Sequence, residues 1–310
     1  MDPLAWMVGA AALGAVGYRR PTDVFRAVLR AALRARGFKT QRATLPDAAV
    51  HYWRGGRGAP VVFVHGFGTE AAVNWYQQMI ACVSSFDVIA PDLPGFGGSD
   101  RIATTNCIAL QVRSLAALLE RLRLDRVVLV GHSMGGWISL AFAAAYPERV
   151  NRLVVVDAAG LRFDPDMSLE RALLPQTIDD VRLLIRANFQ RAVRLPTFVL
   201  RDLLRTARRD VEPRTELLQR LVYGDEHLDD RLHAITAPTL VVWGRGDTLT
   251  PPALGERIAA AIPEARLVIF DDCAHSPNVE QYERFNRLLL EFLRQPRAER
   301  RRDEARVAVG

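Results

Sequence analysis

A single serine stands between closely spaced glycines in the segment "VVLVGHSMGGWISL", residues 127–140. The G-x-S-x-G pattern centred on Ser133 follows an apolar run that predicts a strand and precedes a pattern that predicts a helix. A serine displayed on such a sharp turn needs neighbours without a Cβ two positions away on either side, which accounts for Gly131 and Gly135. We therefore expect Ser133 to be a nucleophile at the tip of a strand.

A serine hydroxyl needs a general base, and that base needs an orienting carboxylate. Asp247 follows the apolar run 239–243, and His275 follows the last such run, 266–270. Active sites of α/β proteins assemble where parallel strands end. We therefore expect His275 to be the base and Asp247 the acid, with Asp157 as the rival acid because it also follows a strand.

The other titratable residues near these motifs are expected to have lesser roles. We expect His132, beside the serine, to be a packing or hydrogen-bonding neighbour rather than the base. Asp271 and Asp272 stand too close to His275 in sequence to orient its ring easily, so they are expected to be loop residues. The remaining histidines without a motif are expected to be structural, and they are His51, His227 and His233.

An acyl-transfer site also needs donors for the developing oxyanion. The glycine-containing loop "HGFG" follows an apolar strand pattern and can turn the Phe67 N–H toward the serine, paired with the Met134 N–H. Losing one such donor costs about 3 kcal/mol in the barrier. The residues expected to support these donors are His65, Gly66, Gly68, Gly131 and Gly135.

Short apolar runs rich in Val and Ile alternate with helical patterns along most of the chain, which predicts a mostly parallel sheet with helices on both faces. The expected strands are 49–53, 61–64, 87–90, 126–130, 152–156, 239–243 and 266–270. Residues 161–232 contain only helical patterns, so we expect a helical cap inserted into a core formed by 43–160 and 233–295. The charged segment 296–310 has no apolar period and predicts a disordered tail.

Composition limits the classes of function. The chain has 310 residues, of which 49% are hydrophobic and 25% charged, so it can bury a sizeable core. The net charge of +6 comes entirely from residues 1–42, so nucleic acid is not expected as a partner of the main domain. Cys82, Cys107 and Cys273 form no CxxC pair, which argues against a zinc site or a disulfide framework, and no cofactor is expected.

The N-terminal segment, residues 1–42, suggests contact with a membrane. The uncharged run 4–18 is marginal in length for a spanning helix, and the arginines follow it, which would leave the main domain on the cytoplasmic side. Arg26, Arg30 and Arg34 form a basic stripe opposite an apolar one, a pattern typical of helices on anionic bilayers. The alternatives are a helix packed on the main domain with a solvated basic face, and a soluble cytoplasmic protein.

In these motifs the chain resembles the capped, single-domain members of the α/β-hydrolase superfamily. The matching motifs, in order, are "HGFG", "PDLPGFGGSD" and "GHSMGG", and the resemblance covers about residues 43–295. It implies a serine hydrolase with Ser133 as nucleophile, His275 as base and Asp247 as acid. The serine excludes the relatives with an aspartate nucleophile, the haloalkane dehalogenases and epoxide hydrolases.

Three functions remain in view. The hydrophobic N-terminus resembles membrane-anchored monoacylglycerol-type lipases and esterases, so we expect hydrolysis of lipid-like acyl esters through an acyl-enzyme. The C–C hydrolases of meta-cleavage products are similar through "PDLPGFGGSD" and "EQYERFNRLLLEFL", but they typically carry a tryptophan where this chain has Ser276. The third possibility is a non-catalytic binding protein on the same fold.

Overall fold

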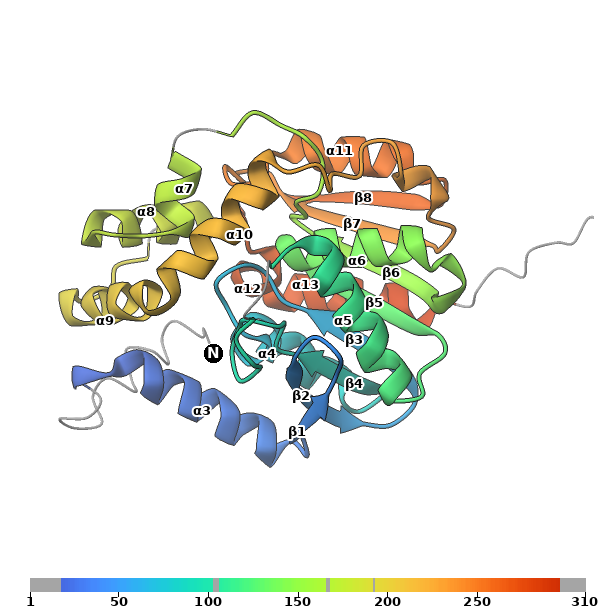
Figure 1. Ribbon diagram of the computed structural model, residues 1–310, viewed down its shortest axis with the longest axis horizontal. Coiled ribbons are helices and arrows are strands. Elements are labelled where there is room, and N and C mark those ends of the chain that lie inside the picture. Colours follow the sequence, from blue (N-terminus) through green and yellow to red (C-terminus); the bar gives the residue numbers. More distant parts are fainter. Residues whose placement is uncertain (1–17, 103–105, 166–167, 192, 296–310) are drawn as a thin grey trace, which may run out of the picture.

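An eight-stranded sheet forms the centre of the protein. The computed structural model describes residues 18–102, 106–165, 168–191 and 193–295 (Figure 1). The strands are β1 (Lys39–Thr44), β2 (Ala49–Gly56), β3 (Ala59–Val64), β4 (Phe86–Pro91), β5 (Val127–His132), β6 (Val150–Val156), β7 (Thr239–Gly244) and β8 (Ala265–Phe270). Their order is β1-β2-β4-β3-β5-β6-β7-β8, and only the β1–β2 and β2–β4 pairs are antiparallel. The mostly parallel sheet predicted from the sequence is confirmed.

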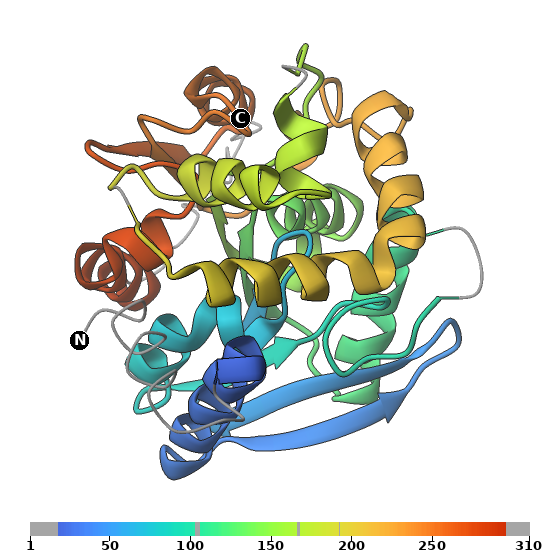
Figure 2. The same ribbon diagram turned by 90° about the vertical axis from the view of Figure 1, so that its left-hand side faces the viewer.

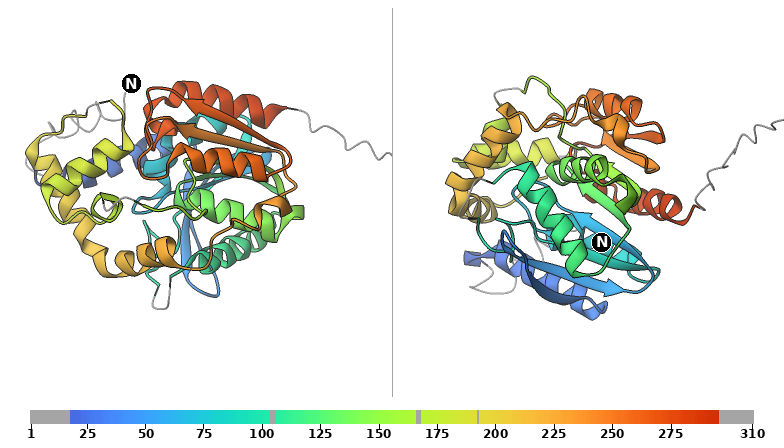
Figure 3. Two further views of the ribbon diagram at one scale, coloured as in Figure 1. Left: turned by 90° about the horizontal axis from the view of Figure 1, so that it is seen from above. Right: turned by 45° about the vertical axis from the view of Figure 1, so that its right-hand side comes forward.

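Helices cover both faces of this sheet. Those described are α3 (Pro21–Ala35), α4 (Ala71–Cys82), α5 (Ile108–Arg121), α6 (Met134–Ala145), α7 (Ser168–Leu173), α8 (Ile178–Asn188), α9 (Thr197–Ala207), α10 (Val211–Tyr223), α11 (Pro252–Ala261), α12 (Pro277–Glu280) and α13 (Tyr282–Arg294). Helices α5, α6 and α11 pack on one face, whereas α3, α4 and α13 pack on the other (Figure 3).

The inner strands, β3 to β7, are apolar on both sides because both sides are buried. In β3, Val62 and Val64 point into the core with α5 and α6, and Val61 and Phe63 point into the core with α4 and α13. This alternation follows from the two-residue period of a strand. A parallel sheet covered on both faces reads as a continuous apolar run, which is why these inner strands were predictable.

Strand β1 was missed by the sequence analysis. Its sequence, "KTQRAT", is polar, and every residue except Ala43 is exposed. It pairs with only one neighbour, β2, at the edge of the sheet, where exposed polar side chains are tolerated. The sheet therefore begins at Lys39, inside the segment that the sequence analysis had assigned to the N-terminus.

The arginines of α3 face the rest of the protein, contrary to expectation. Arg30 lies 3.2 Å and Arg26 3.7 Å from the same oxygen of the buried Glu70 carboxylate. The Arg34 guanidinium lies 5.7 Å from the centre of the Trp53 ring. A stripe that pairs internally in this way is not a free basic face, so the described part of α3 does not support the predicted binding to a bilayer.

The predicted hydrophobic run falls almost entirely within residues 1–17, which lie outside the described part of the chain, as does the predicted tail, 296–310. Among the described residues, no helix combines the length and apolar character that crossing a membrane requires.

The helices α7 to α10 are inserted in the sequence between β6 and β7. They lie beyond the ends of the strands, and α9 lies beside α3 (Figures 1 and 2). The buried Asp202 carboxylate of α9 accepts hydrogen bonds from the backbone N–H of Thr22, at 2.9 Å, and from its hydroxyl. This contact joins the start of α3 to the inserted helices.

Removing the Thr22 hydroxyl should loosen this joint. We expect Thr22→Val to lower the free energy of unfolding by about 1–3 kcal/mol, because a buried carboxylate loses one hydrogen-bond donor. Urea unfolding measures the change. Thr40→Val, at an exposed position of β1, is the control and should stay close to wild type. Equal stability of the wild type and Thr22→Val would contradict this role for the hydroxyl.

Candidate active site

Ser133 sits on a strained turn between β5 and α6. Its φ is 55° and its ψ −119°, a conformation that non-glycine residues rarely adopt. A Cβ on Gly131 would lie 2.3 Å from the Gly135 carbonyl oxygen, and a Cβ on Gly135 would lie 2.2 Å from the Val64 carbonyl oxygen. The two glycines are therefore required by the close approach of the backbone, while the strain falls on the serine itself.

His275 and Asp247 form the expected pair. The His275 Nδ1 donates to Oδ2 of Asp247 at 2.8 Å, and both residues are buried. The other carboxylate oxygen of Asp247 accepts from the N–H groups of Leu249, at 2.8 Å, and Thr250, at 3.0 Å, and the Thr250 hydroxyl reaches Oδ2 at 2.7 Å. Burial alone would raise the pKa of Asp247, but its interactions with His275, Asp157 and Thr250 together outweigh burial and hold that pKa below its ordinary value.

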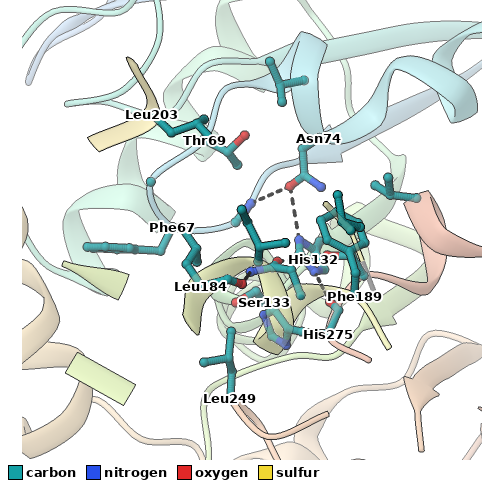
Figure 4. Close-up of a pocket in the computed structure, with 18 of the residues that line it drawn as sticks. Phe67, Thr69, Asn74, His132, Ser133, Leu184, Phe189, Leu203, Leu249 and His275 are labelled. Carbon is teal, nitrogen blue, oxygen red and sulfur yellow. Dashed lines mark hydrogen bonds between the residues drawn. The ribbon is translucent and has the colours of Figure 1, made fainter. Parts of the chain in front are cut away.

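The Ser133 and His275 side chains open into one chamber. Because Nδ1 of His275 is bound to Asp247, its Nε2 is the ring nitrogen left for the serine. Both residues line the same cavity, and Figure 4 places them next to each other. The structure thus brings together Ser133, His275 and Asp247 from three separate loops.

His132 supports this arrangement from behind. Its Nε2 donates to the His275 carbonyl oxygen at 2.7 Å, and the two ring centres lie 5.0 Å apart. Burial lowers the pKa of His132 to about 3, so the ring is neutral at physiological pH. It acts as a hydrogen-bonding neighbour, which is the role the sequence analysis predicted.

The loop before Phe67 is fixed by two polar side chains, those of His65 and Asn74. Nδ1 of His65 donates to the Gly66 carbonyl oxygen at 2.8 Å, while its Nε2 accepts from the Leu93 N–H at 2.9 Å. Burial lowers the pKa of His65, which agrees with this neutral ring. The Gly66 N–H donates to Oδ1 of Asn74 at 2.8 Å (Figure 4).

The loop after Phe67 turns at Gly68, whose φ of 73° favours glycine. Met134 is the first residue of α6, so its N–H belongs to the free donors at a helix start. The structure therefore places both predicted oxyanion donors at the ends of neighbouring strands, β3 and β5.

Two supporting residues were not predicted. Asn74 lies in α4, and its role depends on a contact eight residues back along the chain, for which the sequence has no local signal. Thr250 holds Asp247 through its N–H and its hydroxyl. The spacing of aspartate and threonine in "GDTLT" is typical of a turn in which a side chain caps the backbone, and it could have revealed Thr250.

The other histidines and acids lie away from the chamber. His51 contacts Asp92 at 2.9 Å, and His233 is exposed. The His227 ring stacks on Trp137. Asp271 forms an exposed ion pair with Arg245, and Asp272 lies in a turn with φ of 53°.

One group of acids and histidine within the described residues could in principle hold a metal ion. The ligand atoms of Asp157, Asp247 and His275 lie within 4.8 Å of one another. However, the Asp247 and His275 atoms that would face an ion are hydrogen-bonded to each other at 2.8 Å. We therefore interpret the group as a hydrogen-bonded cluster rather than as a metal site.

Comparison with known proteins agrees with this geometry. Residues 61–288 match the model of the alpha/beta hydrolase family. The chain belongs to this family. The match begins in β3 and continues to α13, so it includes the serine turn, the acid and the histidine.

Its relatives include enzymes of more than one kind. The chain is 34% identical over 276 residues to a 2-hydroxy-6-oxononadienedioate/2-hydroxy-6-oxononatrienedioate hydrolase from Burkholderia vietnamiensis, covering 80% of this chain and 92% of the relative. It is similar in structure to a meta-cleavage product hydrolase from Pseudomonas fluorescens, with a TM-score of 0.75, 28% identity and coverage of 82% and 97%. It is also similar to a membrane phospholipase A described as a bacterial virulence factor, with a TM-score of 0.78, 27% identity and coverage of 94% and 96%.

The buried His132 should make stability fall in acid. Its folded pKa of about 3 is below the ordinary value near 6.5, so between about pH 6.5 and about pH 3 the unfolded chain binds a proton that the folded chain does not. Stability should therefore decrease on acidification across this window, by up to about 1.4 kcal/mol per pH unit from this residue.

We expect His132→Asn to reduce that slope, as measured by urea unfolding at several pH values. His65 contributes with the same sign, so some slope should remain. His233→Asn, which changes an exposed histidine, is the matched control and should leave the slope unchanged. An identical slope in the wild type and His132→Asn would contradict a neutral buried ring.

Proposed function

We propose that the protein is a serine hydrolase that cleaves esters of apolar acyl chains. In this proposal Ser133 is the nucleophile, His275 the general base and Asp247 the acid that orients it, with the N–H groups of Phe67 and Met134 as the oxyanion hole. The observation that carries the proposal is the uncharged, mostly apolar chamber that opens directly onto Ser133.

The chamber has a volume of about 330 Å³. Among the described residues that line it, none is an arginine, lysine, aspartate or glutamate. Its apolar wall comes from α3, α8, α9 and the segments around them, through Phe25, Leu29, Leu173, Val181, Leu184, Ile185, Phe189, Val193, Leu195 and Leu203. Moving an acyl chain from water to such a wall lowers the free energy of binding by roughly 0.8 kcal/mol per buried methylene.

The inserted helices form part of the wall of the chamber next to the triad. Leu184 from α8 lies next to Ser133 in Figure 4, and Leu203 from α9 lines the same chamber near Thr69. We therefore propose that residues 161–232 act as a cap that encloses the acyl chain, with residues 43–160 and 233–295 as the catalytic core.

The proposed reaction proceeds in two halves. Nε2 of His275 takes the proton of the Ser133 hydroxyl as its oxygen attacks the ester carbonyl, and the oxyanion is stabilised by the N–H groups of Phe67 and Met134. The imidazolium then returns the proton to the leaving alcohol, which leaves an acyl-enzyme. Water, deprotonated by the same ring, attacks the acyl-enzyme, and the acid leaves as Ser133 regains its proton.

The second candidate function is hydrolysis of a C–C bond in a ring-fission product. The names of the curated relatives favour it over ester hydrolysis, because they describe hydrolases of dienedioates and trienedioates. Such substrates carry carboxylates, and desolvating a carboxylate without a cationic partner is costly. The part of the lining that the structure describes offers no such cation, and Ser276 stands after the histidine. The likeness to a phospholipase, which extends over 94% of this chain, also supports the ester.

A direct comparison of substrates decides between the two functions. We expect p-nitrophenyl esters of medium and long acyl chains to be hydrolysed, a dienoate ring-fission product to be turned over poorly, and Ser133→Ala to lose about 10³-fold or more of the esterase rate. Ser84→Ala changes an exposed serine and is the control. Faster turnover of the dienoate than of any ester would establish the second candidate. Equal rates for the wild type and Ser133→Ala on both kinds of substrate would remove both candidates.

Phe25 should limit the length of the acyl chain, because it lines the chamber from α3. We expect Phe25→Ala to raise kcat/KM for long-chain esters relative to short-chain ones by roughly 10-fold, since extra methylenes then find space. Val28→Ala, on the same helix but outside the chamber lining, is the control. The measurement is kcat/KM across a series of acyl chains. An unchanged chain-length profile in Phe25→Ala would contradict contact between α3 and the substrate.

A further inference from the structure

We propose that Asp157 is a positioning residue of the triad, held as a neutral carboxylic acid that donates its proton in a hydrogen bond to Asp247. This inference rests on the triad of the proposed function, but not on the choice of substrate. It gives a role to the residue that the sequence analysis identified only as a rival acid.

The geometry places two carboxyl groups close together and away from water. Asp157 follows β6, is fully buried, and has a φ of 44°, so its position is held by the surrounding structure against backbone strain. An oxygen of its carboxyl lies within 4.8 Å of one of Asp247, and Oδ2 of Asp157 is buried without a hydrogen-bond partner among the described residues. Two buried carboxylates this close cannot both be ionised at low cost, so we infer that the pair shares a proton.

The donors around the pair decide which group holds the proton. Asp247 has the Leu249 and Thr250 N–H groups, the Thr250 hydroxyl and the His275 ring as donors. The Asp157 carboxyl has one, the Gly244 N–H at 2.9 Å, which bonds to Oδ1. Hydrogen bonds to a charged oxygen stabilise the charge, so the anion resides on Asp247 and the proton on Asp157. Burial and the charge of Asp247 both raise the pKa of Asp157 well above its ordinary value.

The other titratable groups near the pair do not compete for this arrangement. The Nδ1 of His275 is hydrogen-bonded to Asp247, and the His132 ring, whose centre lies 5.0 Å from that of His275, is neutral. The Cys273 thiol stays protonated, because burial and the nearby Glu280 raise its pKa. Glu280 itself accepts from the Ala274 N–H at 3.1 Å.

The proton on Asp157 has two consequences for the triad. It leaves a single negative charge beside His275, so the imidazolium is stabilised without a second buried anion. It also gives Asp247 a further donor, which fixes the direction of its carboxylate toward the ring. The Thr250 hydroxyl lies 2.7 Å from Oδ2 of Asp247 and 3.0 Å from the Asp157 backbone carbonyl oxygen, so it braces the same pair.

Asp157→Asn and Asp157→Ala test this role through the reaction of Ser133 with a fluorophosphonate probe, measured as a function of pH. An asparagine is neutral and keeps an N–H donor, so the acid limb of the labelling rate should stay at its wild-type position. An alanine has no donor, so the Asp247 carboxylate loses one of the hydrogen bonds that stabilise its charge. It then favours the protonated ring of His275 over the neutral one more strongly. The acid limb should then move to higher pH by roughly half to one unit.

The opposite arrangement has a different signature. If Asp157 were ionised, Asp157→Asn would remove a negative charge near His275, and the acid limb would move to lower pH by roughly one unit or more. That shift would overturn the proposal. An unmoved limb in Asp157→Ala would also overturn it, because a residue that only fills space does not change the pH profile.

Infrared spectroscopy gives a readout that needs no substrate and no activity. The wild type at neutral pH should show the carbonyl band of a buried carboxylic acid, and this band should be absent in Asp157→Asn. Asp125→Asn changes an exposed aspartate and should retain the band. If the band is missing from the wild type, Asp157 is not protonated and the inference fails. If the wild type does not react with the probe, the proposed function fails, while the band still reports where the proton lies.

Discussion

The active site depends on how closely the backbone of β3 approaches the start of α6. The Val64 carbonyl oxygen leaves no space for a Cβ on Gly135, and the Gly135 carbonyl oxygen leaves none on Gly131. This contact holds Ser133, which lines the chamber, in a conformation that serine disfavours. It also joins β5, which precedes Ser133, to β3, which precedes the Phe67 loop, so the proposed nucleophile and the proposed oxyanion donors are positioned by the same packing.

Behind the serine, the site is a buried polar network in which few groups are charged. His65 and His132 are neutral because burial disfavours their protonated forms, and each uses its ring as a directed donor. Asp247 keeps its charge because several donors surround it. Electrostatic interactions are strong in such a low-dielectric region, so the position of each proton matters to catalysis.

The chamber above the serine bears on which substrate this chain can take. Relatives of similar sequence are named for hydrolysis of dienedioates, yet the described lining of this chamber carries no cationic side chain. Helix α3 provides part of that lining through Phe25 and Leu29, and its link to Asp202 ties the wall to the inserted helices. The same catalytic groups can thus serve different substrates, because specificity depends on the residues that surround them.

The sequence alone predicted where seven of the strands lie along the chain, the serine turn and the residues expected to join it, because each depends on a local pattern of side chains. The polar edge strand β1 and the support from Asn74 could not be predicted, since each depends on a partner distant in sequence. Only the tertiary structure decided that the arginines of α3 face Glu70 and Trp53, because a helical stripe shows which residues share a face but not what that face meets. Likewise, Asp157 and Asp247 lie close together because β6 and β7 are neighbours in the sheet, which places two acids from separate loops side by side.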